Sequence, residues 1–339
     1  MSLNVLITAG SRRVPLVQAF QRALRASGHG SVIVTDVNPL SPTVYVADRS
    51  YPVPLSTDPG YLDAISEICA TERIGLIVPT IDDELFAFAE NTGRFADAGV
   101  LVAVSPLETI AVCNDKYTTC RLLIERGVRA AETHLPADLP ADPEFPLFIK
   151  PRVGRGGVGA FPVRSQRELD FFLEYVTDPV VQSYLNGPEF TIDMCCSFTG
   201  EPLSIVPRER VVVRAGVVDR ARTVRDPQLI ELGRACARAL SFVGPVNIQC
   251  RIVDGRPVVF EINPRFSGGI PLTVAAGANF PSALVRMARG EPLSPRLGEF
   301  RPNLWMTKYD AALFLPAEGV QLTSLDRVAR VTSRGKAVA

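Results

Sequence analysis

The sequence predicts an α/β domain with a doubly wound parallel sheet, followed by an α+β region built on antiparallel strand pairs. Two observations lead to this class. Short apolar strands alternate with amphipathic helices over residues 1–112, as they do around a parallel sheet. After a proline-rich link, PADLPADPEFP, hairpin signals replace that alternation. The architecture is therefore expected to change near residue 112.

The elements of the first domain follow from apolar runs bounded by turn residues. Four strands are predicted, at residues 3–8, 31–35, 74–79 and 100–104. Three helices are expected between them, over residues 14–28, 61–71 and 83–98. Another helix is predicted over 110–127, and a strand over 147–150 follows the proline-rich link.

Composition and charge exclude several classes of protein. The chain has 36 Lys plus Arg and 36 Asp plus Glu, so a net charge of zero gives no support to nucleic-acid or membrane-surface binding. No apolar run is long enough for a membrane helix, and the start of the chain reads as a strand and not as a signal peptide. Seven scattered cysteines without a CxxC pair predict reduced, buried thiols. We therefore expect a cytoplasmic protein.

The glycine-rich segment GRGGVG, at residues 154–159, is a candidate phosphate-binding loop. It fits G-x-G-x-x-G, but the residues after it are strand-like and include a proline, so it does not open a helix as a dinucleotide-binding turn must. We expect a hairpin loop whose backbone N–H groups close over phosphates; a plain glycine hairpin is the alternative. Lys150 ends the strand before this loop, where its cation would face phosphate oxygens or remain a solvated strand end.

Polar side chains recur at every second position in the strands VNIQCRI and VVFEINPR. Since side chains alternate along a strand, Glu261, Asn263 and Arg265 share one face, and Gln249 lies on the polar face of the other strand. If the two polar faces match, Gln249, Glu261 and Asn263 converge as oxygen ligands, which suit Mg²⁺. Arg265 beside them would offset charge on a transferring phosphoryl group.

The length of the turn decides whether these faces match. A two-residue turn at Asp254 and Gly255 would place Gln249 opposite Phe260, on the apolar face. We therefore expect an odd number of loop residues, three in the simplest case, with Gly255 in a left-handed conformation. The three oxygen ligands should then face the loop 154–159.

Taken in chain order, these motifs resemble the ATP-grasp superfamily. The motifs are Lys116, Lys150-Pro, the glycine loop, QSYLNGPE at 182–189, Gln249 and EINPR at 261–265. The resemblance is to the branch that holds carbamoyl phosphate synthase large subunits, biotin carboxylases and stand-alone carboxylate–amine ligases. It implies a pre-ATP-grasp domain at 1–112, and a two-lobed ATP-grasp fold with a small lobe at 113–182 and a large lobe at 183–305. A C-terminal extension would follow at 306–339.

The resemblance also implies roles for individual residues. The implied ATP-binding residues are Lys116, Lys150, Gly154, Arg155, Gly156, Gly157, Gly159, Gln182, Ser183, Leu185 and Glu189. Among them, Gln182 would bind the adenine amine, Ser183 and Leu185 would offer backbone contacts, and Glu189 would hold the ribose. Gln249, Glu261 and Asn263 would bind Mg²⁺ or Mn²⁺, and Arg265 and Lys150 would act in catalysis. Gln249 and Gln182 stand where many relatives carry acidic residues.

The implied reaction is an ATP-dependent ligation. ATP converts a carboxylate into an acyl phosphate, which an amine or another nucleophile attacks, releasing ADP and phosphate. Positioning and electrostatics dominate phosphoryl transfer, which agrees with a chain that has only two histidines. A carbamoyl- or carboxyphosphate-forming enzyme and a non-catalytic nucleotide-binding module are the alternatives. The sequence names neither small-molecule substrate, and it leaves a homodimer open.

Three polar segments are candidates for substrate contacts. Arg208 and Arg210, with Arg214, would anchor an acidic substrate or line a solvated strand edge. The segment TIDDE at 80–84 follows a predicted parallel strand, where it would bind an amine unless Asp82 only caps the next helix. Arg12 and Arg13 would contact substrate or lie on the surface.

Overall fold

The computed structural model describes residues 2–154, 156–214 and 216–315, and the chain folds into two compact units. The first unit holds residues 2–104, 281–293 and 309–315 of the described chain, and the second holds 105–280 and 294–308. Residues 316–339 of the predicted C-terminal extension lie outside the described residues, as does Arg155.

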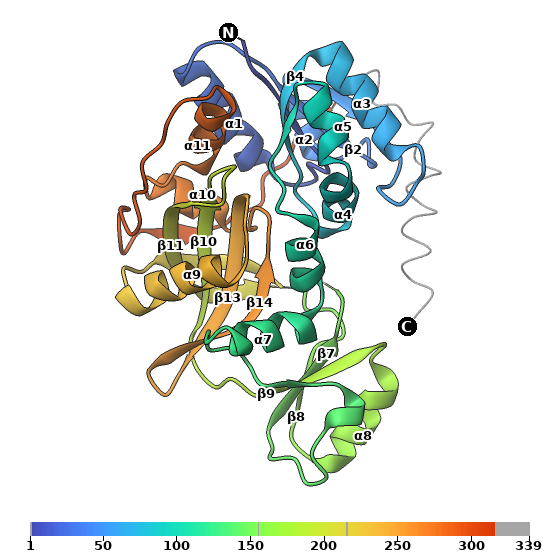
Figure 1. Cartoon of the computed structure of the whole chain (residues 1–339), viewed down its shortest axis with the longest axis vertical. Helices are drawn as coiled ribbons and strands as arrows, with labels where there is room; N and C mark the ends of the chain where they lie inside the picture. The colour runs from blue at the N-terminus through green and yellow to red at the C-terminus, as the bar shows by residue number, and fades with distance from the viewer. Residues whose placement is uncertain (1, 155, 215, 316–339) are drawn as a thin grey trace. The chain divides into compact units, whose positions relative to one another are not determined.

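The first unit is built on a parallel sheet of five strands in the order β3-β2-β1-β4-β5 (Figure 1). The strands are β1 (Asn4–Ile7), β2 (Val32–Asp36), β3 (Arg49–Pro52), β4 (Ile74–Val78) and β5 (Leu101–Val102). The helices are α1 (Val14–Ala26), α2 (Pro42–Val46), α3 (Tyr61–Glu72), α4 (Asp82–Glu90) and α5 (Thr92–Asp97), and most of α11 (Phe280–Ala288) belongs here too. The predicted doubly wound parallel sheet is confirmed.

Three details of this unit differ from the prediction, and one of them is the short helix α2, which was not expected. Strand β3 was not expected, because its residues are exposed or half-buried and its sequence RSYP has no apolar run. As an edge strand it pairs only with β2, so it needs no apolar side chains on both faces. The helix expected over 83–98 is two helices, because Asn91 leaves the helical conformation and separates α4 from α5.

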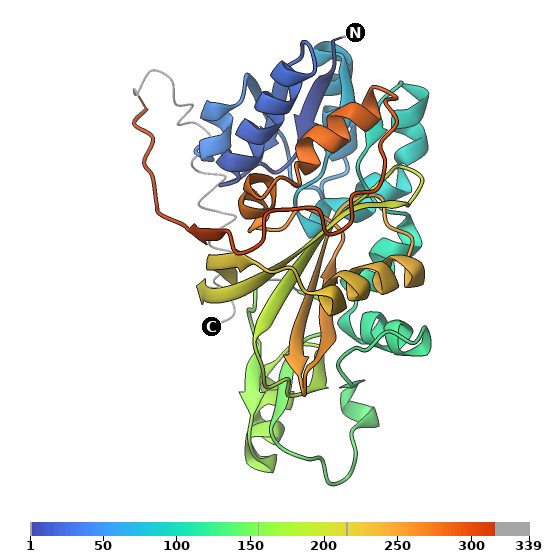
Figure 2. The ribbon, with the colours of Figure 1, turned by 90° about the vertical axis from the view of Figure 1, so that its left-hand side faces the viewer.

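The second unit contains a six-stranded antiparallel sheet in the order β14-β13-β10-β11-β12-β15. Its strands are β10 (Glu189–Cys196), β11 (Pro202–Arg214), β12 (Val217–Thr223), β13 (Gly244–Val253), β14 (Arg256–Asn263) and β15 (Trp305–Thr307). Figure 2 shows the longer strands as twisted ribbons with α9 (Pro227–Ala239) along one face. The helix α10 (Ile270–Ala275) follows β14. The predicted antiparallel pairs are confirmed.

A smaller antiparallel sheet in the same unit has the order β6-β9-β7-β8. It consists of β6 (Thr133–His134), β7 (Leu147–Pro151), β8 (Phe161–Val163) and β9 (Pro179–Ser183), with the short helix η1 (Pro136–Asp138) and α8 (Gln166–Tyr175). Leu169 of α8 packs against Ile149 and Val181 to form a separate small core.

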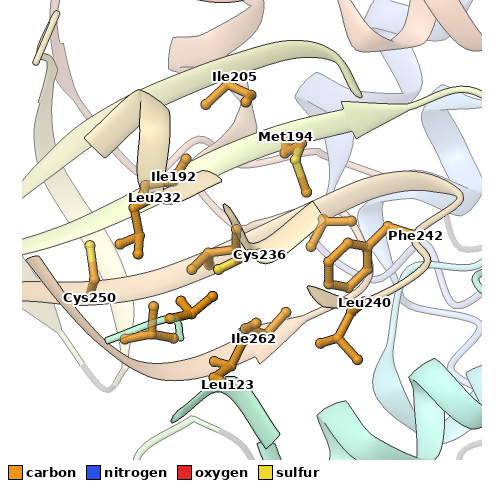
Figure 3. Close-up of a cluster of buried hydrophobic side chains, with 14 of the residues drawn as sticks. Leu123, Ile192, Met194, Ile205, Leu232, Cys236, Leu240, Phe242, Cys250 and Ile262 are labelled. Carbon is orange, nitrogen blue, oxygen red and sulfur yellow. The ribbon is translucent and has the colours of Figure 1, made fainter. Parts of the chain in front are cut away.

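The larger core of the second unit lies between α9, α7 and the six-stranded sheet. Figure 3 shows Leu232 and Cys236 of α9 beside Ile192, Met194 and other side chains of the strands. All seven cysteines fall within the described residues, and each is buried with a free thiol, which confirms the prediction for these residues. No helix among the described residues is long and apolar enough to cross a membrane.

The helix predicted over 110–127 is divided at Asp115 into α6 (Leu107–Asn114) and α7 (Lys116–Glu125). Asp115 is extended, and its carboxylate accepts hydrogen bonds from the N–H groups of Tyr117 and Thr118, so it caps α7. Burial alone would raise the pKa of this carboxyl, but the hydrogen bonds from Arg152 and Thr118 outweigh it and lower the pKa. The cap places Lys116 at the first position of α7.

Candidate active site

The polar faces of β13 and β14 lie on the same side of the hairpin, although the turn between the strands would by itself place them on opposite sides. Val253 pairs with Arg256, so the turn has only two residues, Asp254 and Gly255, both with positive φ (48° and 72°). The prediction of a three-residue loop was therefore wrong. Phe260 restores the match, because it is the extra residue of a β-bulge between the pairs Gln249–Glu261 and Cys250–Val259.

The bulge brings the predicted oxygen ligands together. Gln249 lies directly opposite Glu261, and Asn263 is two residues further along the same face. The Nδ2 of Asn263 donates to Glu261 Oε1 at 3.2 Å, and Nη2 of Arg265 donates to Asn263 Oδ1 at 3.1 Å. Asn247, which the sequence placed on this face without a role, donates to the carbonyls of Asn263 and Arg265. A carboxylate, two amides and a guanidinium thus form one connected group.

The bulge also changes the surroundings of Phe260. The sequence placed this side chain in the apolar core, but Val259 takes that place in the large core cluster. The ring of Phe260 instead lies 5.3 Å from Nζ of Lys150, and the Phe260 carbonyl accepts a hydrogen bond from that Nζ at 3.2 Å. The bulged residue therefore links the strand carrying Glu261 to Lys150 of β7.

Lys150 is a buried cation among several charged groups. Its side chain is 6% exposed, and burial lowers the pKa of its ammonium to about 8. The negative charges of Glu261 and Glu189 oppose this shift, and the nearby charge of Lys116 adds to it. A solvated strand end, the alternative considered for this residue, is therefore excluded. A buried lysine with few protein partners suits the anionic oxygens of a ligand.

Lys116 fixes the start of the glycine loop. Its Nζ donates to the carbonyl of Gly154 at 2.7 Å, and its backbone N–H donates to the carbonyl of Arg152. Four glycines of the loop have positive φ, with values of 150°, 70°, 70° and 70° for Gly154, Gly156, Gly157 and Gly159. These conformations suit glycine, and they turn backbone N–H groups in directions that ordinary residues rarely allow.

The predicted adenine-binding residues lie on β9 and in the loop after it. Gln182 is buried, and its Nε2 donates to Thr133 Oγ1 at 2.8 Å and to Cys120 Sγ at 3.3 Å. Its amide donors are thus used within the protein. The backbone N–H of Ser183 already donates to the carbonyl of Glu132. Leu185 is half-buried in the segment between β9 and β10.

Glu189, at the start of β10, is held by two arginines. Its Oε1 lies 2.7 Å from Nε of Arg210, and its Oε2 lies 2.7 Å from Nη2 of Arg251. Neither ion pair was expected, because the sequence gives no sign of which arginine on a neighbouring strand faces a given carboxylate.

The predicted basic patch on β11 is mostly not a surface patch. Arg208 is 1% exposed and makes a two-point ion pair with Asp193 of β10, with Nε–Oδ2 2.7 Å and Nη2–Oδ1 3.0 Å. Its Nη2 also donates to Ser267, and the Thr273 hydroxyl donates to Asp193. Arg210 is partly buried and pairs with Glu189, and only Arg214 of the three is largely exposed. Of the two alternatives for Arg208, the solvated strand edge is therefore excluded.

In the first unit, the segment at 80–84 contains a buried carboxyl. Glu84 accepts hydrogen bonds from Tyr61 Oη at 2.5 Å and Thr8 Oγ1 at 2.8 Å, and burial raises the pKa of this carboxyl to about 7. The favoured role of Asp82 as a cap was wrong: Ile81 precedes the helix, and Asp82 is its first residue. Arg13 donates to the carbonyl of Thr80, whereas Arg12 is exposed.

The oxygen donors of the candidate site suit a hard cation that is held by protein oxygens and by substrate phosphates together. Across the described part of the chain, no three His, Cys, Asp or Glu side chains cluster as a protein-only metal site would require. Glu261 with the amides of Gln249 and Asn263 offers one carboxylate and two neutral oxygens. Mg²⁺ is commonly held by one or two carboxylates together with substrate phosphates, so these residues fit that ion.

Two family models match parts of the chain, and solved structures share its fold. Residues 176–310 match the family model described as ATP-grasp in the biosynthetic pathway with Ter operon, and residues 5–103 match the PylC-like N-terminal domain. The solved biotin carboxylase of Campylobacter jejuni, in a β-γ-ATP complex, covers 89% of this chain and 74% of its own, with a TM-score of 0.71 and 14% identity. Residues 176–310 therefore resemble an ATP-grasp domain, and most of the chain shares its fold with this biotin carboxylase. The resemblance and the fold class predicted from the sequence are both confirmed.

Two further proteins are similar to this chain. The carbamoyl phosphate synthase large chain of Thermoanaerobacter sp. (strain X514) is 26% identical over 309 residues, which is 84% of this chain and 28% of that protein. The chain thus spans less than a third of that relative. The solved L-amino acid ligase of Bacillus licheniformis is 22% identical, covers 88% of this chain and 77% of its own, and has a TM-score of 0.68.

Proposed function

We propose that the protein is an ADP-forming ligase that activates a small carboxylate as an acyl phosphate and couples it to an amine or another nucleophile. The observation that carries the proposal is the connected group of Glu261, Asn263 and Arg265, with Gln249 opposite Glu261. The bulge at Phe260 joins this group to Lys150. It combines oxygen donors for Mg²⁺ with two cations for transferring phosphate. The family and fold support the same reaction.

Each residue has a role in this proposal. Gln249, Glu261 and Asn263 would hold Mg²⁺ or Mn²⁺, which neutralises phosphate charge when bound. Lys150 and Arg265 would stabilise charge on the oxygens of the transferring group. Binding of ATP would use Lys116, the glycine loop including Arg155, Gln182 through its carbonyl oxygen, Ser183, Leu185 and Glu189. The proposal includes a cytoplasmic location and a homodimer. The molar mass in solution tests the homodimer.

A carbamoyl- or carboxyphosphate-forming reaction is the second candidate, because the carbamoyl phosphate synthase relative matches 84% of this chain. Release of ADP should be measured with MgATP against bicarbonate and against a panel of small carboxylates, each with and without amines. Release that needs a carboxylate and an amine together supports the ligase. Release that bicarbonate alone induces supports the second candidate, and no release with any pair supports a non-catalytic module.

Binding of MgATP is expected to stabilise the fold, whereas NAD is expected to have no effect. A ligand at about 100 times its dissociation constant adds roughly 2.7 kcal/mol to the free energy of unfolding. The thermal midpoint should be measured with MgATP, with ATP and chelator, and with NAD. A shift with NAD and none with MgATP would contradict the proposal.

Affinity for MgATP is expected to fall as the pH rises through about 8. Burial lowers the pKa of Lys150 to about 8, so the ammonium that faces phosphate is present below this pH and lost above it. Binding above that pH requires uptake of one proton, which weakens affinity up to about tenfold per pH unit. The dissociation constant should be measured between pH 7 and 9.5. The Lys150→Arg variant, whose cation does not titrate there, is expected to show no such fall, and a flat wild-type profile would exclude this role.

A further inference from the structure

The turn between β11 and β12 lies against the glycine loop, and both belong to the same unit. A Cβ atom added to Gly216 of this turn would lie 2.5 Å from the carbonyl oxygen of Gly156, and 2.6 and 2.9 Å from its carbonyl carbon and Cα. Real Cβ atoms are essentially never this close to backbone atoms. The two backbones are therefore in direct contact, and Gly216 leaves no room for a side chain.

Other turns of the same sheet do not make such a contact. Gly200, in the turn before β11, also has positive φ (88°). A Cβ atom added to it would have the carbonyl oxygen of Phe242 as its nearest neighbour, at 3.6 Å. Gly255, in the turn of β13 and β14, has nothing within 4 Å. Positive φ explains a glycine in all three turns, whereas the close approach to another loop is a property of Gly216.

Arg210 connects this turn to the predicted ribose residue. Its Nη2 donates to the carbonyl of Gly216 at 3.1 Å, while its Nε lies 2.7 Å from Glu189 Oε1. The side chain of Arg210 is 9% exposed, and Arg251 holds the other carboxylate oxygen of Glu189. A continuous set of contacts thus runs from Glu189 through Arg210 and Gly216 to Gly156.

We propose that the tip of the β11–β12 hairpin is a positioning element for the phosphate-binding loop, with Gly216 as its contact and Arg210 as its anchor. This inference rests on the proposed function, since it assigns the glycine loop to ATP phosphates. A loop with four glycines in left-handed conformations has much conformational freedom to lose on binding phosphate. The hairpin tip reduces that freedom in advance. It follows that the tip contributes to binding of the triphosphate and not to binding of adenosine.

The test compares Gly216→Ala with Gly200→Ala, which places the same strain at the other end of β11. Dissociation constants for MgATP and for adenosine, and the thermal midpoint without ligand, are measured for the wild type and both variants. Both variants are expected to lower the midpoint, Gly216→Ala by the larger amount, because its Cβ also meets the backbone of Gly156. Gly216→Ala should weaken MgATP at least tenfold and adenosine less than twofold. Gly200→Ala should change neither constant by more than twofold.

Arg210→Lys provides a second test that avoids strain at the glycine. It keeps a cation beside Glu189 but lacks the guanidinium nitrogen that reaches Gly216, so MgATP should weaken several-fold with adenosine unchanged. The positioning role is overturned if the wild type binds MgATP and both variants, Gly216→Ala and Arg210→Lys, bind it as tightly as the wild type. The proposed function stands in that case. Equal losses for MgATP and adenosine also overturn it. A wild type that does not bind MgATP overturns both.

Discussion

Replacing Glu261 by Gln is expected to reduce turnover about a thousandfold while the protein stays folded. Glu261 is half-buried on the polar face of β14 and is the one carboxylate of the proposed Mg²⁺ site. Its loss removes charge stabilisation from the metal-bound transition state, and a thousandfold corresponds to about 4 kcal/mol. The Gln side chain is of similar size, so the packing of the strand should change little.

Turnover is measured as ADP formation with MgATP and the carboxylate–nucleophile pair that the screen identifies. Binding of Mn²⁺, followed by electron paramagnetic resonance, gives a second readout that does not depend on the pair. Glu201→Gln is a suitable control, because Glu201 is exposed in the turn between β10 and β11. Near-normal turnover of Glu261→Gln would show that this carboxylate is not a metal ligand.

Replacing Arg208 by Met is expected to lower the free energy of unfolding of the second unit by about 3–5 kcal/mol, because it leaves the Asp193 carboxylate buried without its cation. Both partners are 1% exposed, so water cannot replace the lost ion pair. Arg238→Met is the matched control. Its partner Glu231 and Arg238 itself are mostly exposed, so the loss should stay below about 1 kcal/mol.

The single tryptophan of the chain, Trp305, is 59% exposed in the folded protein, so unfolding is followed by far-ultraviolet circular dichroism instead of by its fluorescence. Urea titrations should be compared for the two variants and for the double variant Asp193→Leu with Arg208→Met. The double variant is expected to recover much of the lost stability, because it leaves no unpaired charge. Equal losses for Arg208→Met and Arg238→Met would show that the buried pair contributes no more than a surface one.

The parallel sheet was predictable because each central strand is an apolar run of its own. Strand β2, for example, is VIVTD and is buried throughout, and no knowledge of its neighbours is needed to identify it. The edge strand β3 was missed for the opposite reason, since exposed and half-buried residues carry no such signal.

The candidate site was predictable in its residues but not in its register. Alternation along β14 placed Glu261 and Asn263 on one face, which the structure confirms. The bulge at Phe260 could not be predicted, because no residue type marks it in the sequence. The position of Arg208 was left open for a related reason: the sequence does not show that Asp193 lies beside it, so it could not decide between a substrate anchor and a solvated strand edge.

The bulge at Phe260 also limits which changes of length the β13–β14 hairpin can accept. Adding one residue to the turn, or removing the extra residue of the bulge, would alone rotate Gln249 to the opposite face from Glu261. Both changes together would restore the pairing, but the Phe260 carbonyl that Lys150 now contacts would be lost with the bulge. Among natural variants of this chain, insertions in the turn should therefore occur only together with loss of the bulge, and with a different partner for the lysine.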